Sequence, residues 1–233
     1  MREPAFKRPA HREVLALLGE LDRSFLARVK CYFGGGTRIV LELGEYRESR
    51  DIDFLCADRE GYRLLRESIG ETSLEPVARK AVKLAREVRS DQYGIRTFVA
   101  RQGVNLKFEI IREARIGLAS ASVPMLPVAC LDRTHCFAEK FLANADRGLD
   151  ASTLSRDIVD LSFMVEGWDG ADAEAGLSVA KEAYGSSVER MLGAVTRKMH
   201  DDRAYRRKCV EGLAVSDTKV LGAGLKSLGR IAG

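Results

Sequence analysis

The segments FGGGT at residues 33–37 and DIDF at residues 51–54 are the most informative parts of this chain. A glycine run between a strand and a helix lets the backbone approach a phosphate closely, because no Cβ stands in the way. The helix that follows offers unpaired N–H groups and a partial positive charge to an anion. Thr37 adds a hydroxyl donor at the same place. By itself the glycine run is equally consistent with a tight turn.

The Asp-x-Asp pair changes that balance. Asp51 and Asp53 fall on a predicted strand over residues 51–56, where side chains at i and i+2 point to the same face. Two carboxylates held side by side repel each other unless a cation lies between them. Hard oxygen ligands of this kind suit Mg²⁺, or Mn²⁺, which takes its remaining ligands from water and substrate phosphates. Standing alone, the pair would indicate two solvated aspartates, but its place one short helix after the glycine turn favours a metal and nucleotide-triphosphate site.

A third carboxylate is expected beside this pair. Residues 94–100 and 104–111 are β-rich and are separated by Arg101-Gln102-Gly103, which predicts a hairpin. In the second strand the apolar residues share one face, and Glu109 lies on the polar face. A neighbouring strand could bring Glu109 to a two-metal site, where it would bind one ion or accept the proton of an attacking hydroxyl. A solvated glutamate on an edge strand explains Glu109 equally well.

Outside these motifs the pattern predicts an α+β (α/β mixed-sheet) fold. We expect a palm-like domain with a mixed β-sheet over residues 1–120, followed over residues 121–233 by a helical domain that closes the active-site cleft. Pro124 and Pro127, among small residues, mark the boundary. Apolar spacing and caps predict helices at 11–29, 37–43, 60–70, 77–90 and 154–165, the last with Asp150 or Ser152 as its cap, and a helical tail beyond residue 167.

Composition narrows the class of protein. The chain has 233 residues, of which 45% are hydrophobic and 31% charged, so it is globular and carries no apolar run long enough for a membrane helix. A net charge of +4 is too small to demand a nucleic-acid partner, although basic residues gather at 79–89 and 197–208. The five cysteines form no C-x-x-C pair, and the N-terminus has no apolar signal core. These features predict a cytoplasmic protein with reduced thiols.

At the glycine and aspartate motifs the chain resembles the AbiEii/AbiGii toxin nucleotidyltransferases of the DNA polymerase β-like superfamily. These are the toxins of type IV toxin–antitoxin and phage abortive-infection systems. The resemblance rests on Gly35-Gly36-Thr37, on Gly44 with Arg47 and Ser49, and on the DIDF segment. The family's Gly-x-Arg-x-Ser stretch has one extra residue here. Arg38-Ile39 replaces a pair that is usually small and apolar, which leaves the substrate open.

The resemblance implies a set of site residues. Asp51, Asp53 and Glu109 would bind metal and act in catalysis, and the nucleotide would contact Gly34, Gly35, Gly36, Thr37, Arg47 and Ser49. A later Lys-x-x-Ala-x-x-x-Arg element is matched from Lys140 to Arg147, and an Arg-Asp-h-x-Asp-Leu element from Arg156 to Leu161. By resemblance, Lys140 would contact phosphate, and Asp157 or Asp160 would serve the active site.

Helix geometry favours Asp157 over Asp160 for this role. Asp157 flanks the apolar stripe of its predicted helix, and Asp160 lies further round. The alternatives are a solvated Lys140 and a helical ion pair from Arg156 to Asp160.

These observations predict an Mg²⁺-dependent nucleotidyltransferase that transfers NMP from an NTP to an acceptor hydroxyl. Resemblance to the toxins suggests tRNA or another RNA as the acceptor, and a cognate antitoxin as a partner. Two alternatives are an antibiotic-type enzyme that modifies a small molecule and a decayed protein that only binds nucleotide. About the last seventy residues carry no motif that resembles the family.

Overall fold

The computed structural model describes residues 6–232 and contains two compact units. The first unit comprises the chain up to Glu42 together with Ser49–Asp132, and the second comprises Leu43–Glu48 together with the chain from Arg133 onward. The first five residues lie outside the described range, and the prediction that the N-terminus has no apolar signal core falls partly on them. Among the described helices, none has both the length and the hydropathy that crossing a membrane requires.

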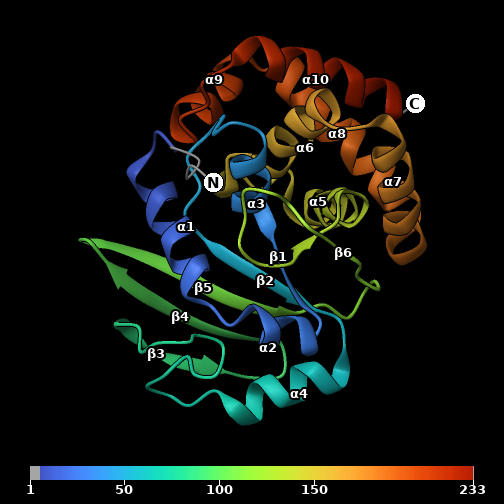
Figure 1. Ribbon diagram of the computed structural model, residues 1–233. Helices are drawn as coiled ribbons and strands as arrows, with labels where there is room; N and C mark the ends of the chain where they lie inside the picture. The colour runs from blue at the N-terminus through green and yellow to red at the C-terminus, as the bar shows by residue number, and fades with distance from the viewer. Residues whose placement is uncertain (1–5, 233) are drawn as a thin grey trace. The chain divides into compact units, whose positions relative to one another are not determined.

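A seven-stranded mixed sheet forms the centre of the first unit (Figure 1). Its strand order is β3-β4-β5-β2-β1-β7-β6, with β2 parallel to β5 and β1 parallel to β7. The α+β expectation is therefore confirmed. The strands are β1 (Cys31–Gly34), β2 (Ile52–Cys56), β3 (Leu84–Ser90), β4 (Gly94–Arg101), β5 (Val104–Arg112), β6 (Ser120–Ala121) and β7 (Cys130–Leu131).

One face of this sheet is apolar and carries the core of the unit. Phe33, Phe54 and Phe108 come from three adjacent strands and are fully buried. They belong to one apolar cluster with side chains from α1, α2 and α4, and Figure 1 shows α1 lying across the strands. The opposite face of β5 carries Lys107 and Glu109, as the alternating pattern predicts. The helices of this unit are α1 (Pro9–Glu20), α2 (Arg23–Arg28), α3 (Gly35–Glu42) and α4 (Arg59–Ser68).

The predicted helix over residues 11–29 is two helices. Leu21 is extended, with φ −74° and ψ 152°, and it forms an isolated bridge to Ala78. Asp22 then caps α2 by accepting a hydrogen bond from the N–H of Phe25. The apolar spacing runs through the break because both helices pack on the same core.

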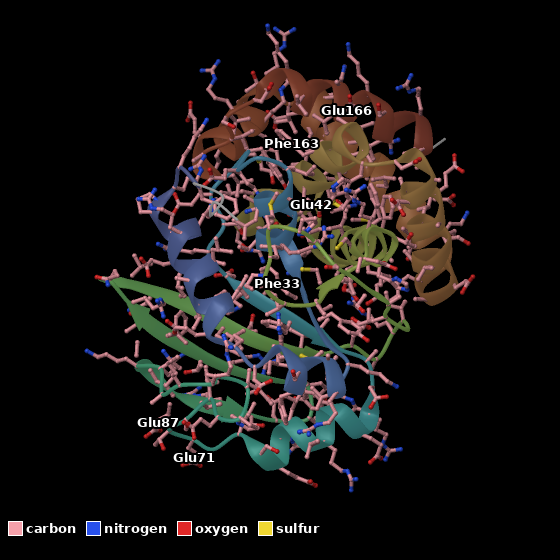
Figure 2. The ribbon with its side chains drawn as sticks, in the orientation of Figure 1. Phe33, Glu42, Glu71, Glu87, Phe163 and Glu166 are labelled. Atoms are coloured by element: carbon pink, nitrogen blue, oxygen red, sulfur yellow. The ribbon has the colours of Figure 1, made fainter. Side chains whose placement is uncertain are left out.

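The predicted helix over residues 77–90 is wrong. Residues 84–90 form β3, which pairs antiparallel with β4 at the outer edge of the sheet. The N–H of Val88 donates to the carbonyl of Glu71, so this strand has backbone partners on both sides. Figure 2 shows Glu71 and Glu87 near each other at this edge. These partners are distant in sequence, so the residues of β3 themselves show no periodic pattern that would predict a strand.

The regular elements of the second unit, within its described residues, are all helices. Its helices are α5 (Arg133–Arg147), α6 (Arg156–Gly167), α7 (Gly170–Tyr184), α8 (Ser187–Asp201), α9 (Arg203–Gly212) and α10 (Thr218–Ile231), with a 3₁₀ turn η1 (Ala151–Thr153) before α6. Asp150 caps η1, not α6, because its side chain accepts from the N–H of Ser152. The predicted helix start near residue 154 therefore moves to Arg156.

Residues 43–48 belong to the second unit although they follow α3 in the chain. The Tyr46 ring stacks on Phe163 (labelled in Figure 2), with centroids 3.9 Å apart. Backbone hydrogen bonds run from the N–H of Glu48 to the carbonyl of Leu213 and from the N–H of Ser216 to the carbonyl of Tyr46. Residues 43–48 are thus anchored by α6 and by the loop between α9 and α10.

Candidate active site

The glycine turn lies directly against the first acidic residue of β2. Gly35 begins α3 immediately after β1 and has a φ of +69°, which L side chains rarely adopt. A Cβ at Gly35 would lie 2.4 Å from Oδ2 of Asp53 and 2.9 Å from its Cβ. Only glycine permits this approach, so the local backbone brings a carboxylate next to the N-terminus of α3.

Glu109 occupies the position beside Asp53. In the parallel pair of β2 and β5, Asp53 is in register with Glu109, and Gly34 of β1 is in register with Asp53 on its other side. Residues matched across adjacent strands share a face, with the strands about 4.8 Å apart. The expected convergence of Asp53 and Glu109 near the glycine turn is therefore present in the sheet.

Asp51 stands just outside this register. The strand predicted over residues 51–56 begins at Ile52, so Asp51 is the half-buried residue that directly precedes it. Its chain position still places it two residues before Asp53.

Two cations that belong to none of the sequence motifs hold the Glu109 carboxylate. Arg96 of β4 donates its Nε–H to Oε1 of Glu109 at 3.0 Å, and the ammonium of Lys107 donates to Oε2. Glu109 is 12% exposed, whereas both cations are 39% exposed. The hairpin could have revealed this partner, because its register around Gln102-Gly103 sets Arg96 opposite Glu109.

The donor set suits a hard divalent cation in its chemistry. Asp51, Asp53 and Glu109 offer only carboxylate oxygens, the ligands that Mg²⁺ and Mn²⁺ prefer. Within residues 6–232, no three or more His, Cys, Asp or Glu side chains are already clustered as a metal site. The oxygens of Glu109 instead accept hydrogen bonds from Arg96 and Lys107. The same carboxylates would hold the ion once these bonds rearrange.

Thr37 and Ser49, both predicted to contact nucleotide, lie together beside the turn. Their hydroxyl oxygens are 2.7 Å apart. The backbone N–H of Ser49 donates to Nε2 of His11 at 3.2 Å, and His11 is completely buried. This contact joins α1 to a loop distant in sequence, so no local motif indicates it.

Arg47, also predicted to contact nucleotide, forms a bidentate ion pair with a carboxylate of the second unit. Its Nε–H donates to Oδ1 of Asp160 at 2.6 Å, and Nη2 donates to Oδ2 at 2.9 Å. The hydroxyl of Tyr46 donates to the same Oδ1 at 2.6 Å. Burial would lower the pKa of Arg47, but the charge of Asp160 raises it above its ordinary value. Arg47 therefore anchors the segment 43–48 to α6.

Lys140 and Asp157 extend this buried network. Nζ of Lys140 lies 2.9 Å from Asp157 and 2.6 Å from Asp160, and Nε of Arg147 lies 2.7 Å from Asp157. Burial alone would raise the pKa of both aspartates, but Lys140 and the two arginines hold their pKa values below the ordinary range. Burial would lower the pKa of Lys140, and the two carboxylates raise it.

These contacts bear on the two alternatives, a solvated Lys140 and a helical ion pair from Arg156 to Asp160. Lys140 is 6% exposed, so it is not a solvated lysine. Asp160 accepts from Tyr46 and Arg47 and pairs with Lys140, so its partners come from beyond its own helix. Asp157 and Asp160 both lie in the network at 1% exposure or less, and burial does not separate them.

Comparison with known proteins agrees with this architecture. The model of the family "Nucleotidyl transferase AbiEii toxin, Type IV TA system" matches residues 16–211. A protein from H. pylori, solved as a candidate nucleotidyltransferase, is similar in fold with a TM-score of 0.55 at 15% identity, covering 95% of this chain and 92% of that one. JHP933 from Helicobacter pylori gives a TM-score of 0.55 at 16% identity, covering 98% and 92%. No curated protein sequence matches the chain significantly.

Proposed function

Because this chain belongs to the AbiEii nucleotidyl transferase toxin family, we propose that it transfers NMP from an NTP to a hydroxyl of an RNA acceptor, in a reaction that depends on Mg²⁺ or Mn²⁺. It is a nucleotidyltransferase by family; the metal, the acceptor and the toxin role are the proposal. One observation carries it. Asp53 is packed against Gly35 at the N-terminus of α3, and Glu109 lies in register beside Asp53 on the neighbouring strand.

Each part of this arrangement has a role in phosphoryl transfer. The turn from Gly34 to Thr37 would hold the triphosphate through backbone N–H groups and the Thr37 hydroxyl, with Ser49 beside it. Mg²⁺ held by Asp51, Asp53 and Glu109 would neutralise phosphate charge and acidify the attacking hydroxyl. Glu109 would bind this ion or accept the proton of that hydroxyl. Positioning and charge neutralisation supply most of the rate in such reactions.

The second unit contributes through its buried network. The resemblance assigns Lys140 to phosphate contact and Asp157 or Asp160 to the active site, and helix geometry favours Asp157. These assignments stand as proposals. Arg47 has a narrower role in this scheme. Its bidentate contact with Asp160 holds residues 43–48 against α6 within the second unit.

The cellular role follows from the family and not from residue geometry. We propose a toxin that is restrained by a cognate antitoxin and that acts on tRNA or another RNA. The five cysteines, all within the described residues, are buried and form no disulfide, which suits a reducing cytoplasm.

Labelled nucleotide distinguishes the proposal from its rivals. The purified chain is incubated with each α-³²P-labelled NTP, Mg²⁺ and total RNA, with and without EDTA. The expected result is label in RNA that requires metal and is lost in Asp53→Asn. Label on a small molecule from a cell extract, with none on RNA, would favour an antibiotic-type enzyme. No transfer to any acceptor, with NTP binding retained, would indicate a decayed site.

A further inference from the structure

A single row of matched residues crosses the sheet through the proposed catalytic carboxylates. Gly34 is in register with Asp53, Asp53 with Glu109, Glu109 with Arg96, and Arg96 with Arg89. The row follows the strand order β1, β2, β5, β4, β3. Because residues matched in register share a face, these side chains project from the same side of the sheet. The face therefore runs from a glycine turn through two carboxylates to a cationic edge.

In-line displacement requires the leaving pyrophosphate and the attacking acceptor to lie at opposite ends of this row of residues. The attacking oxygen and the leaving pyrophosphate lie on opposite sides of the α-phosphorus. In the proposed function the pyrophosphate portion lies at the glycine turn, over β1. The attacking hydroxyl must then come from the other side of Asp53 and Glu109, over β4 and β3. Resting on that function, we propose that the acceptor binds there through its own phosphates, so that Arg96, Lys107 and Arg89 select an oligonucleotide acceptor.

The surface on that side is strongly cationic. Arg96 and Lys107 are each 39% exposed beside Glu109, and Arg89 on β3 is exposed. Arg86 is also exposed on this face, opposite Phe98, and its guanidinium lies 5.7 Å from the centre of that ring. Cations interleaved with an aromatic ring are typical of surfaces that bind single-stranded nucleic acid. A polycationic small acceptor would be repelled by the same side chains.

The spread of these cations indicates a polymer. Arg89 stands two strands away from Glu109, which is about 10 Å at the usual strand spacing. Successive phosphates of an oligonucleotide can occupy this span together, whereas an acceptor with one phosphate brings negative charge to a single point. Arg96 is paired with Asp91 at 3.1 Å as well as with Glu109 at 3.0 Å, so its position on the face is fixed by two carboxylates.

Binding measured without catalysis tests the inference. A fluorescein-labelled 12-nucleotide single-stranded RNA is titrated with the chain by anisotropy, at a series of salt concentrations. Each cation–phosphate contact contributes about 0.7 to the slope of log K against log salt for a single strand. Arg96→Gln, Lys107→Gln and Arg89→Gln should each weaken binding and reduce this slope by about that amount. Arg89 is exposed, so its variant gives a result even if the other two fold poorly.

Arg66→Gln is the matched control. Arg66 is an exposed arginine of α4, a helix that packs on the apolar core. Its loss should leave the slope and the affinity unchanged. The inference is overturned if the wild type does not bind the RNA, or if Arg89→Gln, Arg96→Gln and Lys107→Gln bind as well as Arg66→Gln.

Kinetics separate the inference from the proposed function. Provided that transfer occurs, Arg89→Gln should raise KM for the oligonucleotide acceptor and leave KM for the NTP unchanged, and a matched nucleoside without phosphate should be a poor acceptor. Equal use of nucleoside and oligonucleotide would contradict the inference but leave the proposed function intact. Failure of all transfer, with salt-dependent binding that needs Arg89 and Lys107, would contradict the proposed function alone.

Discussion

The carboxylate of Asp53 occupies the space that a side chain at Gly35 would need, since a Cβ there would lie 2.4 Å from Oδ2. The glycine turn and the acidic strand are therefore fitted to each other at one point. A change at either position must disturb the other.

Gly35→Ala should reduce NMP transfer by about 10²-fold, because a displacement of about 1 Å in a reacting group can cost that much. Gly103→Ala is the control. Gly103 has a similar backbone, with φ +79°, but a Cβ there meets nothing within 4 Å. Both variants should lose about 1–2 kcal/mol of stability from the left-handed backbone. Equal activity in the two variants would show that the contact with Asp53 is not needed.

Asp53→Asn and Glu109→Gln should each lower transfer by about 10²-fold or more, because each removes a metal ligand or proton acceptor. Glu87→Gln, an exposed carboxylate on β3, should retain wild-type activity. Circular dichroism checks that all three variants fold. A Glu109→Gln enzyme with full activity would remove this residue from the site.

Asp160→Asn should destabilise the second unit by about 3–5 kcal/mol, because it leaves buried Arg47 and Lys140 without a full counter-charge. Lys181→Gln breaks an exposed pair with Glu189 and should cost no more than about 1 kcal/mol. Trp168, the only tryptophan of the chain, is buried in this unit and reports its urea unfolding by fluorescence. Similar midpoints for the two variants would contradict a stabilising network.

Acid should weaken the folded protein through Asp157 and Asp160. Despite their burial, the neighbouring cations hold the pKa of each below its ordinary value of about 3.9. Their contribution is therefore present above about pH 4 and is lost as pH falls toward the folded-state values. Urea unfolding at a series of pH values below 5 should show a steeper loss of stability for the wild type than for Asp157→Asn. Carboxyl ¹³C chemical shifts of the wild type give an independent check, since both aspartates should stay ionised at pH 4.

Local sequence patterns were sufficient to predict the elements of the first unit that carry the candidate site. The glycine turn, the hairpin around Gln102-Gly103 and the alternation of β5 depend on neighbours within a few residues. The same patterns misplaced residues 77–90, where the strand is held by backbone partners on β4 and at Glu71. They also ran one helix through Leu21, because apolar spacing does not register a break that leaves the same face buried.

The sequence by itself determined that a glycine turn precedes an Asp-x-Asp strand and that Glu109 lies on a polar strand face, because these features arise from short-range backbone geometry. Only the tertiary structure decided which residues share a register and a charge partner. Parallel pairing put Glu109 beside Asp53, the hairpin gave it Arg96, and helix packing gave Arg47 to Asp160. Such pairs join segments far apart in the chain. They form only when the whole fold brings the partners together and replaces their contacts with water.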